Sequence, residues 1–215
     1  MKPHYSVKQS AITEIEIQKS RFIGRAERVT SEEEARAIIE KVTKEHWKAT
    51  HNCYAYIVGE NAQVQKSSDD GEPAGTAGIP MLEVIKKKQL RDTLVIVTRY
   101  FGGIKLGAGG LVRAYSKTCA QAIAAAGIVE HVPVKIFDVV IDYALYGTVD
   151  NALKHTGYLV RDTQFTENVT IKIAVRLEDI DTFTAWMTNI CNGQCQIIPV
   201  EETFLEVDVK DQETG

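Results

Sequence analysis

The sequence predicts an α+β protein with two domains, residues 1–130 and 131–215. Strand-like and helix-like segments are mixed along the whole chain, and the two parts differ sharply in charge. Residues 1–130 hold 19 Lys and Arg against 15 Asp and Glu, a net charge of +4. Residues 131–215 hold 6 against 14, a net charge of −8. This difference indicates two domains with different surfaces, and it makes the first domain the better candidate for binding phosphate groups.

The overall composition is that of an ordinary globular protein. Hydrophobic residues make up 44% and charged residues 25% of the chain, which argues against a disordered, collagen-like or membrane protein. Residues 1–10 lack the apolar core of a signal peptide, and no run of about 18 apolar residues could span a membrane. We therefore expect a cytoplasmic protein with no membrane partner. The spacing of Cys53, Cys119, Cys191 and Cys195 does not suit a zinc site, so free thiols are expected.

The first domain is expected to begin with a β-hairpin followed by a helix. Residues 12–18 alternate between two faces, residues 21–29 form a second extended run, and a tight turn lies between them. Thr30 or Ser31 then caps a helix that continues to about Trp47. Three glutamates in its first turn suit the positive end of the helix dipole.

The remainder of the first domain alternates strands, loops and helices. In chain order we expect a strand at 52–59, a partner strand at 63–66, a loop at 67–75, a helix at 76–89, a strand at 93–100, a glycine-rich connection at 102–110 and a helix at 111–126. The run at 93–100 is continuously apolar and rich in β-branched residues, which is typical of a strand in the centre of a sheet. Gly127 ends the last helix.

The second domain shows a more regular order. We expect strands and helices at 132–143, 146–156, 158–165, 169–177, 178–192 and 196–209, of which the second and fifth are helices. A glycine, Gly157 or Gly193, follows each helix. The order β-α-β-β-α-β predicts a ferredoxin-like domain.

The most unusual segment lies between the strand at 93–100 and the helix at 111–126. Five glycines fall within nine residues: Gly102, Gly103, Gly107, Gly109 and Gly110. Glycine lets backbone N–H groups approach a ligand, and a helix N-terminus beside such a loop attracts anions. Four cations surround the segment: Arg99, Lys105, Arg113 and Lys117.

The glycine-rich segment fits neither the G-x4-G-K-[ST] phosphate loop nor the G-x-G-x-x-G fingerprint. Two interpretations therefore stay open. In the first, the segment binds an anion through its N–H groups and its cations. In the second, the glycines only permit close packing of the strand against the helix.

Two further stretches hold candidate accessory residues. Asp69, Asp70 and Glu72 lie in a loop that continues to Thr76, and their carboxylates could hold a divalent cation, remain in a solvated turn, or pair with Arg99 or Lys105. His51 and Cys53 lie two residues apart on an expected strand and so share one face. They are either a Cys–His nucleophilic pair or a histidine beside a buried structural cysteine. No catalytic residue, metal or cofactor is assigned.

The residues also resemble a known family. The runs 99–107 (RYFGGIKLG), 69–78 (DDGEPAGTAG), 78–85 (GIPMLEVI) and 51–56 (HNCYAY) are similar to signature segments of the Impact/YigZ family. The resemblance covers roughly residues 15–130, and the remainder resembles the small C-terminal domain of bacterial members.

The resemblance implies a fold and a set of expectations. The first domain would be an α/β sandwich like the second domain of small-subunit ribosomal protein five, a superfamily that includes domain IV of elongation factor G and small-molecule kinases with a glycine-rich phosphate loop. The second would resemble the ferredoxin-like last domain of elongation factor G. Eukaryotic relatives restrain an initiation-factor kinase and carry an additional N-terminal interaction domain. This chain begins almost at the shared domain, so that role is not expected to carry over.

Three functions compete. The first is a non-enzymatic, translation-associated regulator that binds RNA, the ribosome or another anionic partner through the glycine-rich segment. The second is an enzyme or sensor for a small phosphorylated ligand, with phosphate on the same segment and a metal at Asp70 or Glu72. The third is a scaffold that docks a protein partner on the acidic second domain.

Overall fold

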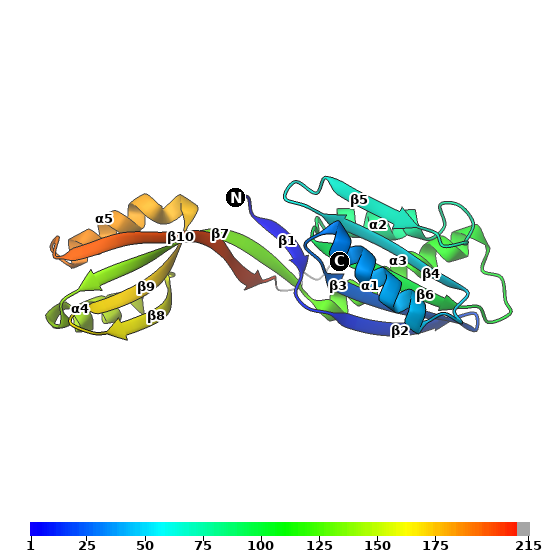
Figure 1. The fold of residues 1–215 in the computed structure, drawn as a ribbon, viewed down its shortest axis with the longest axis horizontal. Helices are drawn as coiled ribbons and strands as arrows, with labels where there is room; N and C mark the ends of the chain where they lie inside the picture. Colours follow the sequence, from blue (N-terminus) through cyan, green and yellow to red (C-terminus); the bar gives the residue numbers. More distant parts are fainter. Residues whose placement is uncertain (210–215) are drawn as a thin grey trace. The chain divides into compact units, whose positions relative to one another are not determined.

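The computed structural model describes residues 1–209, which form two compact units (Figure 1). The N-terminal unit contains His4–Glu130 and Val207–Val209, and the C-terminal unit contains Met1–Pro3 and His131–Glu206. Each unit combines a β-sheet with helices, so the predicted α+β class is confirmed. Among residues 1–209, no helix is both long enough and apolar enough to cross a membrane.

The N-terminal unit is built on one antiparallel sheet with the strand order β2-β3-β6-β4-β5. The strands are β2 (Ala11–Ile17), β3 (Ser20–Arg28), β4 (His51–Val58), β5 (Val64–Ser68) and β6 (Thr93–Tyr100). Both expected hairpins, β2–β3 and β4–β5, are present. The apolar strand β6 lies in the centre and is buried along all but its last residue, as its composition predicts.

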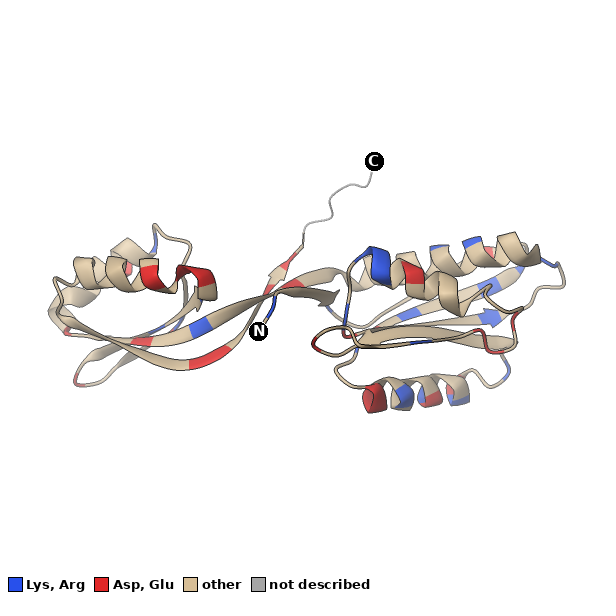
Figure 2. Cartoon of the chain, turned by 90° about the horizontal axis from the view of Figure 1, so that it is seen from above, with Lys and Arg blue, Asp and Glu red and all other residues tan. Residues whose placement is uncertain are grey.

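Helices cover both faces of this sheet (Figure 2). One face packs against α1 (Glu32–Glu45), which is capped by the Ser31 hydroxyl accepting from the Glu34 N–H at 3.1 Å. The other face packs against α2 (Gly78–Lys87) and α3 (Gly107–Ala126), with Phe22 and Tyr115 in the core between them. The result is an α/β sandwich with two separate apolar layers.

Several element boundaries differ from the sequence prediction, and one strand was not predicted. Helix α3 begins at Gly107, not at residue 111, so three of the five glycines occupy its first turn; their poor helix propensity hides this start. Helix α2 begins at Gly78, two residues later than expected. The short strand β1 (His4–Val7) is absent from the sequence prediction, because four residues carry too little periodicity to be read.

The C-terminal unit has the predicted β-α-β-β-α-β order. Its elements are β7 (Ile128–Ile141), α4 (Tyr143–Leu153), β8 (Leu159–Phe165), β9 (Val169–Arg176), the 3-10 turn η1 (Leu177–Asp179), α5 (Ile180–Ile190) and β10 (Cys195–Asp208). Within this unit the strand order is β7-β9-β8, and β10 pairs with β7. Strand β9 therefore lies antiparallel between β7 and β8, which is the split βαβ arrangement of a ferredoxin-like fold.

Candidate functional site

A cavity of about 380 Å³ in the N-terminal unit brings together all three stretches singled out in the sequence. Its lining residues come from the start of β4, the β5–α2 loop, the end of β6 and the start of α3. They are Thr50, His51, Glu72, Pro73, Arg99, Phe101, Lys105, Leu106, Gly107, Ala108 and Leu111. Segments that are far apart in the sequence thus form one site.

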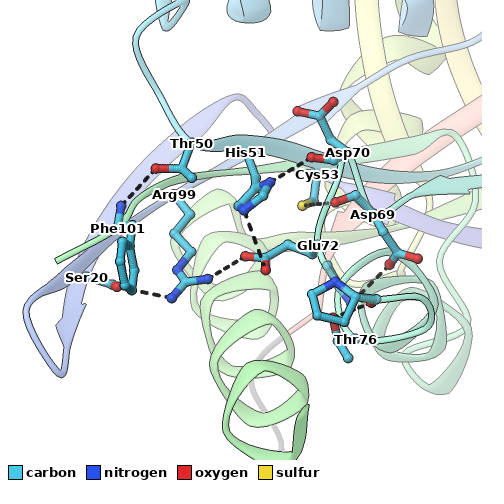
Figure 3. Close-up of polar contacts among 12 residues, drawn as sticks. Ser20, Thr50, His51, Cys53, Asp69, Asp70, Glu72, Thr76, Arg99 and Phe101 are labelled. Atoms are coloured by element: carbon cyan, nitrogen blue, oxygen red, sulfur yellow. Dashed lines mark hydrogen bonds and ion pairs between the residues drawn. The ribbon is translucent and has the colours of Figure 1, made fainter. Parts of the chain in front are cut away.

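A buried ion pair between Arg99 and Glu72 lines this cavity, and Figure 3 shows the two side chains pointing toward each other. Arg99 Nη1 donates to Glu72 Oε1 at 2.7 Å, and the side chains are only 6% and 3% exposed. The Tyr115 hydroxyl donates to the same oxygen, also at 2.7 Å, and burial raises the Tyr115 pKa. The expectation that the acidic loop pairs with Arg99 is confirmed for Glu72. The positive charge of Arg99 is therefore compensated by Glu72 inside the protein.

The Arg99 guanidinium is also held by two aromatic rings. Its central carbon lies 5.4 Å from the ring centroids of both Phe22 and Phe101, a cation–π geometry. Nη2 donates to the Ser20 hydroxyl at 3.3 Å. Its Nε is buried and has no hydrogen-bond partner within residues 1–209. Arg99 thus fixes the position of Phe101, which is 46% exposed at the cavity.

His51 is positioned by the acidic loop. Its Nδ1 lies 2.7 Å from the Asp70 backbone oxygen, and its Nε2 lies 3.6 Å from Glu72 Oε2. The Asp70 carboxylate accepts from the Asn52 N–H at 2.6 Å. Gly71 has φ +85°, and its Cα lies beside the imidazole, where a Cβ would be 3.4 Å from Nδ1. The loop is therefore folded onto the start of β4.

Cys53 is a buried structural residue in this structure. Its thiol is fully buried and donates to the Asp69 carbonyl at 3.0 Å. Burial raises the pKa of Cys53 to about 12, and the nearby carboxylates act in the same direction as burial. A thiol that stays protonated at neutral pH is a poor nucleophile. The geometry favours the buried-cysteine alternative over the Cys–His nucleophile.

Asp69 caps helix α2. Its carboxylate accepts from the N–H groups of Gly75, Ala77 and Gly78 at 2.9, 3.1 and 2.8 Å. Burial favours its neutral form, but the three N–H groups outweigh burial, and the Asp69 pKa is lowered. Thr76, also buried, donates to the Pro73 carbonyl at 2.6 Å and closes the same loop.

The three carboxylates of the acidic loop each have a different protein partner. Asp69 binds the start of α2, Asp70 binds the Asn52 N–H, and Glu72 binds Arg99 and Tyr115. Within the described part of the chain, no group of three or more His, Cys, Asp or Glu is placed to hold a metal ion. The acidic loop works here as a structural element beside the cavity.

The glycines serve different purposes. A Cβ at Gly102 would overlap the Lys19 carbonyl, and the Gly102 N–H donates to the Ser20 hydroxyl at 3.2 Å. Gly103 and Gly107 have φ of +89° and +71°, where other residues are strained. For Gly102, Gly103 and Gly107, the backbone geometry alone explains why the residue is glycine. Gly109 differs: its φ is not positive, and a Cβ would meet only the Arg113 guanidinium, at 3.5 Å.

The first turn of α3 is unlike that of α2. Its N-cap residue, Leu106, makes no side-chain hydrogen bond to the turn, and the turn holds no acidic residue. Lys105, Arg113 and Lys117 are all exposed, and none pairs with an acidic group among residues 1–209. The free N–H groups and the unpaired cations leave this helix end with a positive potential toward solvent.

Sequence reasoning missed several residues that shape the site. Thr50 accepts from the Phe101 N–H at 3.0 Å, and Ser20 contacts both Arg99 and Gly102. Lys19, at the β2–β3 turn, lies against Gly102. No local pattern marks Ser20 or Thr50, because their roles depend on contacts made across the sheet. Only Phe101 had a local sequence signal for a role in the site, because it directly follows the apolar strand β6.

Comparison with known proteins places the chain among its relatives. Residues 18–123 match the Impact N-terminal domain, and residues 139–194 match a domain of unknown function (DUF1949). IMPACT family member YvyE of Bacillus subtilis is 47% identical over 203 residues, which is 94% of each chain. This chain belongs to the Impact family. The Escherichia coli family member YigZ is 32% identical over 87% of this chain and 93% of its own.

A solved structure supports the same assignment of fold. The crystal structure of a protein described as hypothetical aligns with a TM-score of 0.60 and 30% identity, over 94% of this Impact family chain and 98% of its own. The expected resemblance to the Impact/YigZ family, with two domains of mixed α+β structure, is thereby confirmed.

Proposed function

We propose that this Impact family protein binds a phosphate-bearing partner, RNA or the ribosome, at the surface around the start of α3. One observation carries the proposal. The first turn of α3 lines the cavity and has no side-chain cap and no acidic residue. It is accompanied by three exposed cations, Lys105, Arg113 and Lys117, that make no ion pair within residues 1–209. Backbone N–H groups, the helix dipole and positive side chains together favour a phosphate group.

The comparison with α2 supports this proposal. Asp69 already supplies a carboxylate to the N–H groups at the start of α2. The start of α3 presents the same kind of donors with no internal anion in the described chain. An external anion would fill the equivalent position. The net charge of +4 on residues 1–130 favours the approach of a polyanion over the same surface.

A role in translation is the part of the proposal that rests on the family resemblance. The resemblance to domains of a ribosomal protein and of an elongation factor makes the ribosome and its RNA the natural polyanions to consider. We propose a regulatory, non-enzymatic role, because Cys53 is held as a neutral thiol and the three acidic-loop carboxylates are engaged in protein contacts. The expected protein partner of residues 131–215 stays a prediction.

The proposal is tested by measuring the affinity for labelled RNA as a function of salt. Lys105→Ala and Arg113→Ala should each weaken binding and reduce the slope of log K against log salt, by about 0.7 for each phosphate that the variant no longer neutralises. Lys41→Ala is the matched control: Lys41 is exposed on α1, which packs against the opposite face of the sheet. Absence of any RNA binding at low ionic strength would overturn the proposal.

The cavity itself favours a second candidate function, the sensing of a small phosphorylated ligand. Its volume of about 380 Å³ lies within the range of small-molecule sites, and Pro73, Leu106 and Leu111 give it an apolar wall. A ligand that binds only the native state should raise the melting temperature. A thermal-shift screen of nucleotides and phosphorylated metabolites therefore separates the two candidates. If no compound shifts the melting temperature while RNA binds, the small-ligand candidate is wrong.

A further inference from the structure

Two large aromatic side chains of the N-terminal unit are exposed, and one of them, Phe101, lines the cavity. Trp47 is 73% exposed and Phe101 is 46% exposed. Burying a ring of this size stabilises a protein by on the order of 2 kcal/mol. A ring that the fold leaves exposed is therefore a candidate contact for a partner. Trp47 directly follows His46, the C-cap of α1, and Phe101 directly follows the last residue of β6.

Each ring has a cation on one face. The Lys48 ammonium lies 5.2 Å from the Trp47 ring centroid, and the Arg99 guanidinium lies 5.4 Å from the Phe101 ring centroid. A cation on one face restricts the motion of a ring and leaves the remaining exposed area for a partner. This arrangement gives two aromatic platforms, each accompanied by positive charge.

The segments that carry the two rings are joined by direct hydrogen bonds. His46 Nδ1 lies 2.8 Å from the Tyr100 hydroxyl, and the two rings pack edge to face at 6.0 Å. The Thr50 N–H donates to the Arg99 carbonyl at 2.9 Å, and the Phe101 N–H donates to the Thr50 hydroxyl. The α1–β4 loop, which carries Trp47, is therefore bonded directly to the end of β6, which Phe101 follows.

Unpaired cations surround this aromatic surface. Lys19 contacts Gly102 through its carbonyl, Lys48 lies over Trp47, and Lys105 lines the cavity next to Phe101. All three are exposed and make no ion pair with any residue in the described chain. Rings that accept stacking and ammonium groups that accept phosphate are the two features that single-stranded nucleic acid requires.

We infer that the partner at this site is single-stranded RNA, with bases stacked on Trp47 and Phe101 and phosphates on the nearby lysines and the start of α3. The inference rests on the proposed function and names its substrate class. Stacking needs unpaired bases, because the faces of paired bases are covered by their neighbours in a duplex. The surface is therefore expected to prefer single-stranded over double-stranded RNA and to tolerate different sequences.

The fluorescence of Trp47 gives a direct test. The chain contains two tryptophans, and Trp186 packs against Tyr158 and Phe183 in the C-terminal unit. In a Trp186→Phe variant of the full chain, a single-stranded RNA of about 10 nucleotides should quench Trp47 emission and protect it from iodide. Duplex RNA of the same sequence should produce neither effect.

Affinity measurements with matched variants complete the test. Trp47→Ala and Phe101→Ala should each weaken single-strand binding roughly 5- to 150-fold while leaving the salt slope unchanged, because stacking is uncharged. Trp47→Phe should retain most of the affinity. Ile12→Ala should change nothing, since Ile12 is an exposed apolar residue at the other end of β2 from the Lys19 turn.

The possible failures are distinguishable. If RNA binds with a salt dependence that Lys105→Ala reduces, but Trp47→Ala binds as tightly as the wild type, the stacking inference is wrong and the proposed function stands. The aromatic surface then serves another partner, such as a protein. If the unaltered chain binds no RNA at low salt, the proposed function itself is wrong.

Discussion

Arg99 and Glu72 are two charged residues held almost entirely out of water beside the cavity. Removing one member of a buried pair leaves the other charge without compensation, which typically costs about 3–5 kcal/mol. We expect Arg99→Met to lower the free energy of unfolding by that amount, because Glu72 keeps only Tyr115 and the more distant His51. Urea unfolding followed by circular dichroism measures the change.

A double variant and a surface pair provide the controls. Arg99→Met combined with Glu72→Met should recover much of the lost stability, since well-packed apolar groups often replace a buried pair without loss. Arg21→Met breaks the exposed pair with Glu14 and should have little effect. If Arg99→Met were as mild as Arg21→Met, the buried pair would not stabilise the fold.

The Asp69 carboxylate is expected to stabilise the protein in a pH-dependent way. Because its native pKa is lowered, its contribution is complete above the unfolded value near 3.9 and is lost as the pH falls through the native value. Asp69→Ala should lower stability by about 0.5–2 kcal/mol at pH 7, the usual loss for a helix cap. The difference between variant and wild type should shrink below about pH 4. A difference that persists unchanged to pH 2 would contradict the capping role.

The four cysteines should differ strongly in reactivity. Cys53, Cys119 and Cys191 are fully buried, and burial raises the pKa of each to about 12. Cys195 is the one cysteine with partial exposure. Native protein at about pH 8 should therefore lose one thiol quickly to a labelling reagent and three only after unfolding. Mass spectrometry of the labelled peptides identifies them, and rapid labelling of Cys53 would revive the nucleophile hypothesis.

At the scale of elements, the glycines at the start of α3 make a paired prediction. Gly102→Ala should destabilise the protein strongly, because its Cβ would overlap the Lys19 backbone. Gly109→Ala should be neutral or stabilising by up to about 1 kcal/mol, since alanine is the better helix former and the position has space. Thermal unfolding of the two variants measures the contrast.

The same Gly109 variant also tests the site. If a phosphate approaches the first turn of α3, the added methyl group should weaken RNA binding even though stability is kept. Unchanged affinity in Gly109→Ala would place the phosphate elsewhere on the cationic surface.

Local sequence rules correctly predicted those helices and strands whose position depends only on the residues within them. The apolar run of β6, the Ser31 cap of α1 and the β-α-β-β-α-β order are all properties of short segments. The start of α2 was misplaced because its cap, Asp69, lies eight residues before Ala77. A cap is ordinarily sought directly before a helix, so no local rule finds it.

The candidate site was only partly predictable for the same reason. Sequence identified the Arg99 cation and the glycine cluster, and it allowed a pair between the acidic loop and Arg99. It did not show that Arg99 is buried, because that depends on Phe22 and Glu72 packing around it from other strands and loops. The exposure of Trp47 and Phe101 was likewise not predictable, because it depends on which other segments of the fold pack over the two rings.

At the scale of the whole molecule, the net charge of −4 conceals where charge can act. It combines a positive first part with a strongly negative second part. Within the positive part, Arg99 is neutralised internally, whereas Lys19, Lys105, Arg113 and Lys117 remain exposed near the start of α3. The proposed binding of a polyanion therefore depends on a local arrangement of cations that make no ion pair among residues 1–209, and substitutions that preserve the total charge but move these four cations should still abolish it.

The two units have separate hydrophobic cores, which predicts local effects of core substitutions. Phe22 is fully buried among the residues between α2, α3 and their sheet, and Phe183 is fully buried in the C-terminal unit against Phe137 and Tyr158. Replacing either phenylalanine with alanine should destabilise its own core by about 3–5 kcal/mol.

Hydrogen exchange measured by mass spectrometry can assign each loss to a region. In Phe183→Ala, exchange should accelerate in peptides from β9 and α5 and stay unchanged in peptides from β6 and α3. Phe22→Ala should give the reverse pattern. If either substitution accelerated exchange equally in all four elements, the units would unfold together, and β7 and β10, whose residues belong to both, would couple the two cores into one cooperative structure.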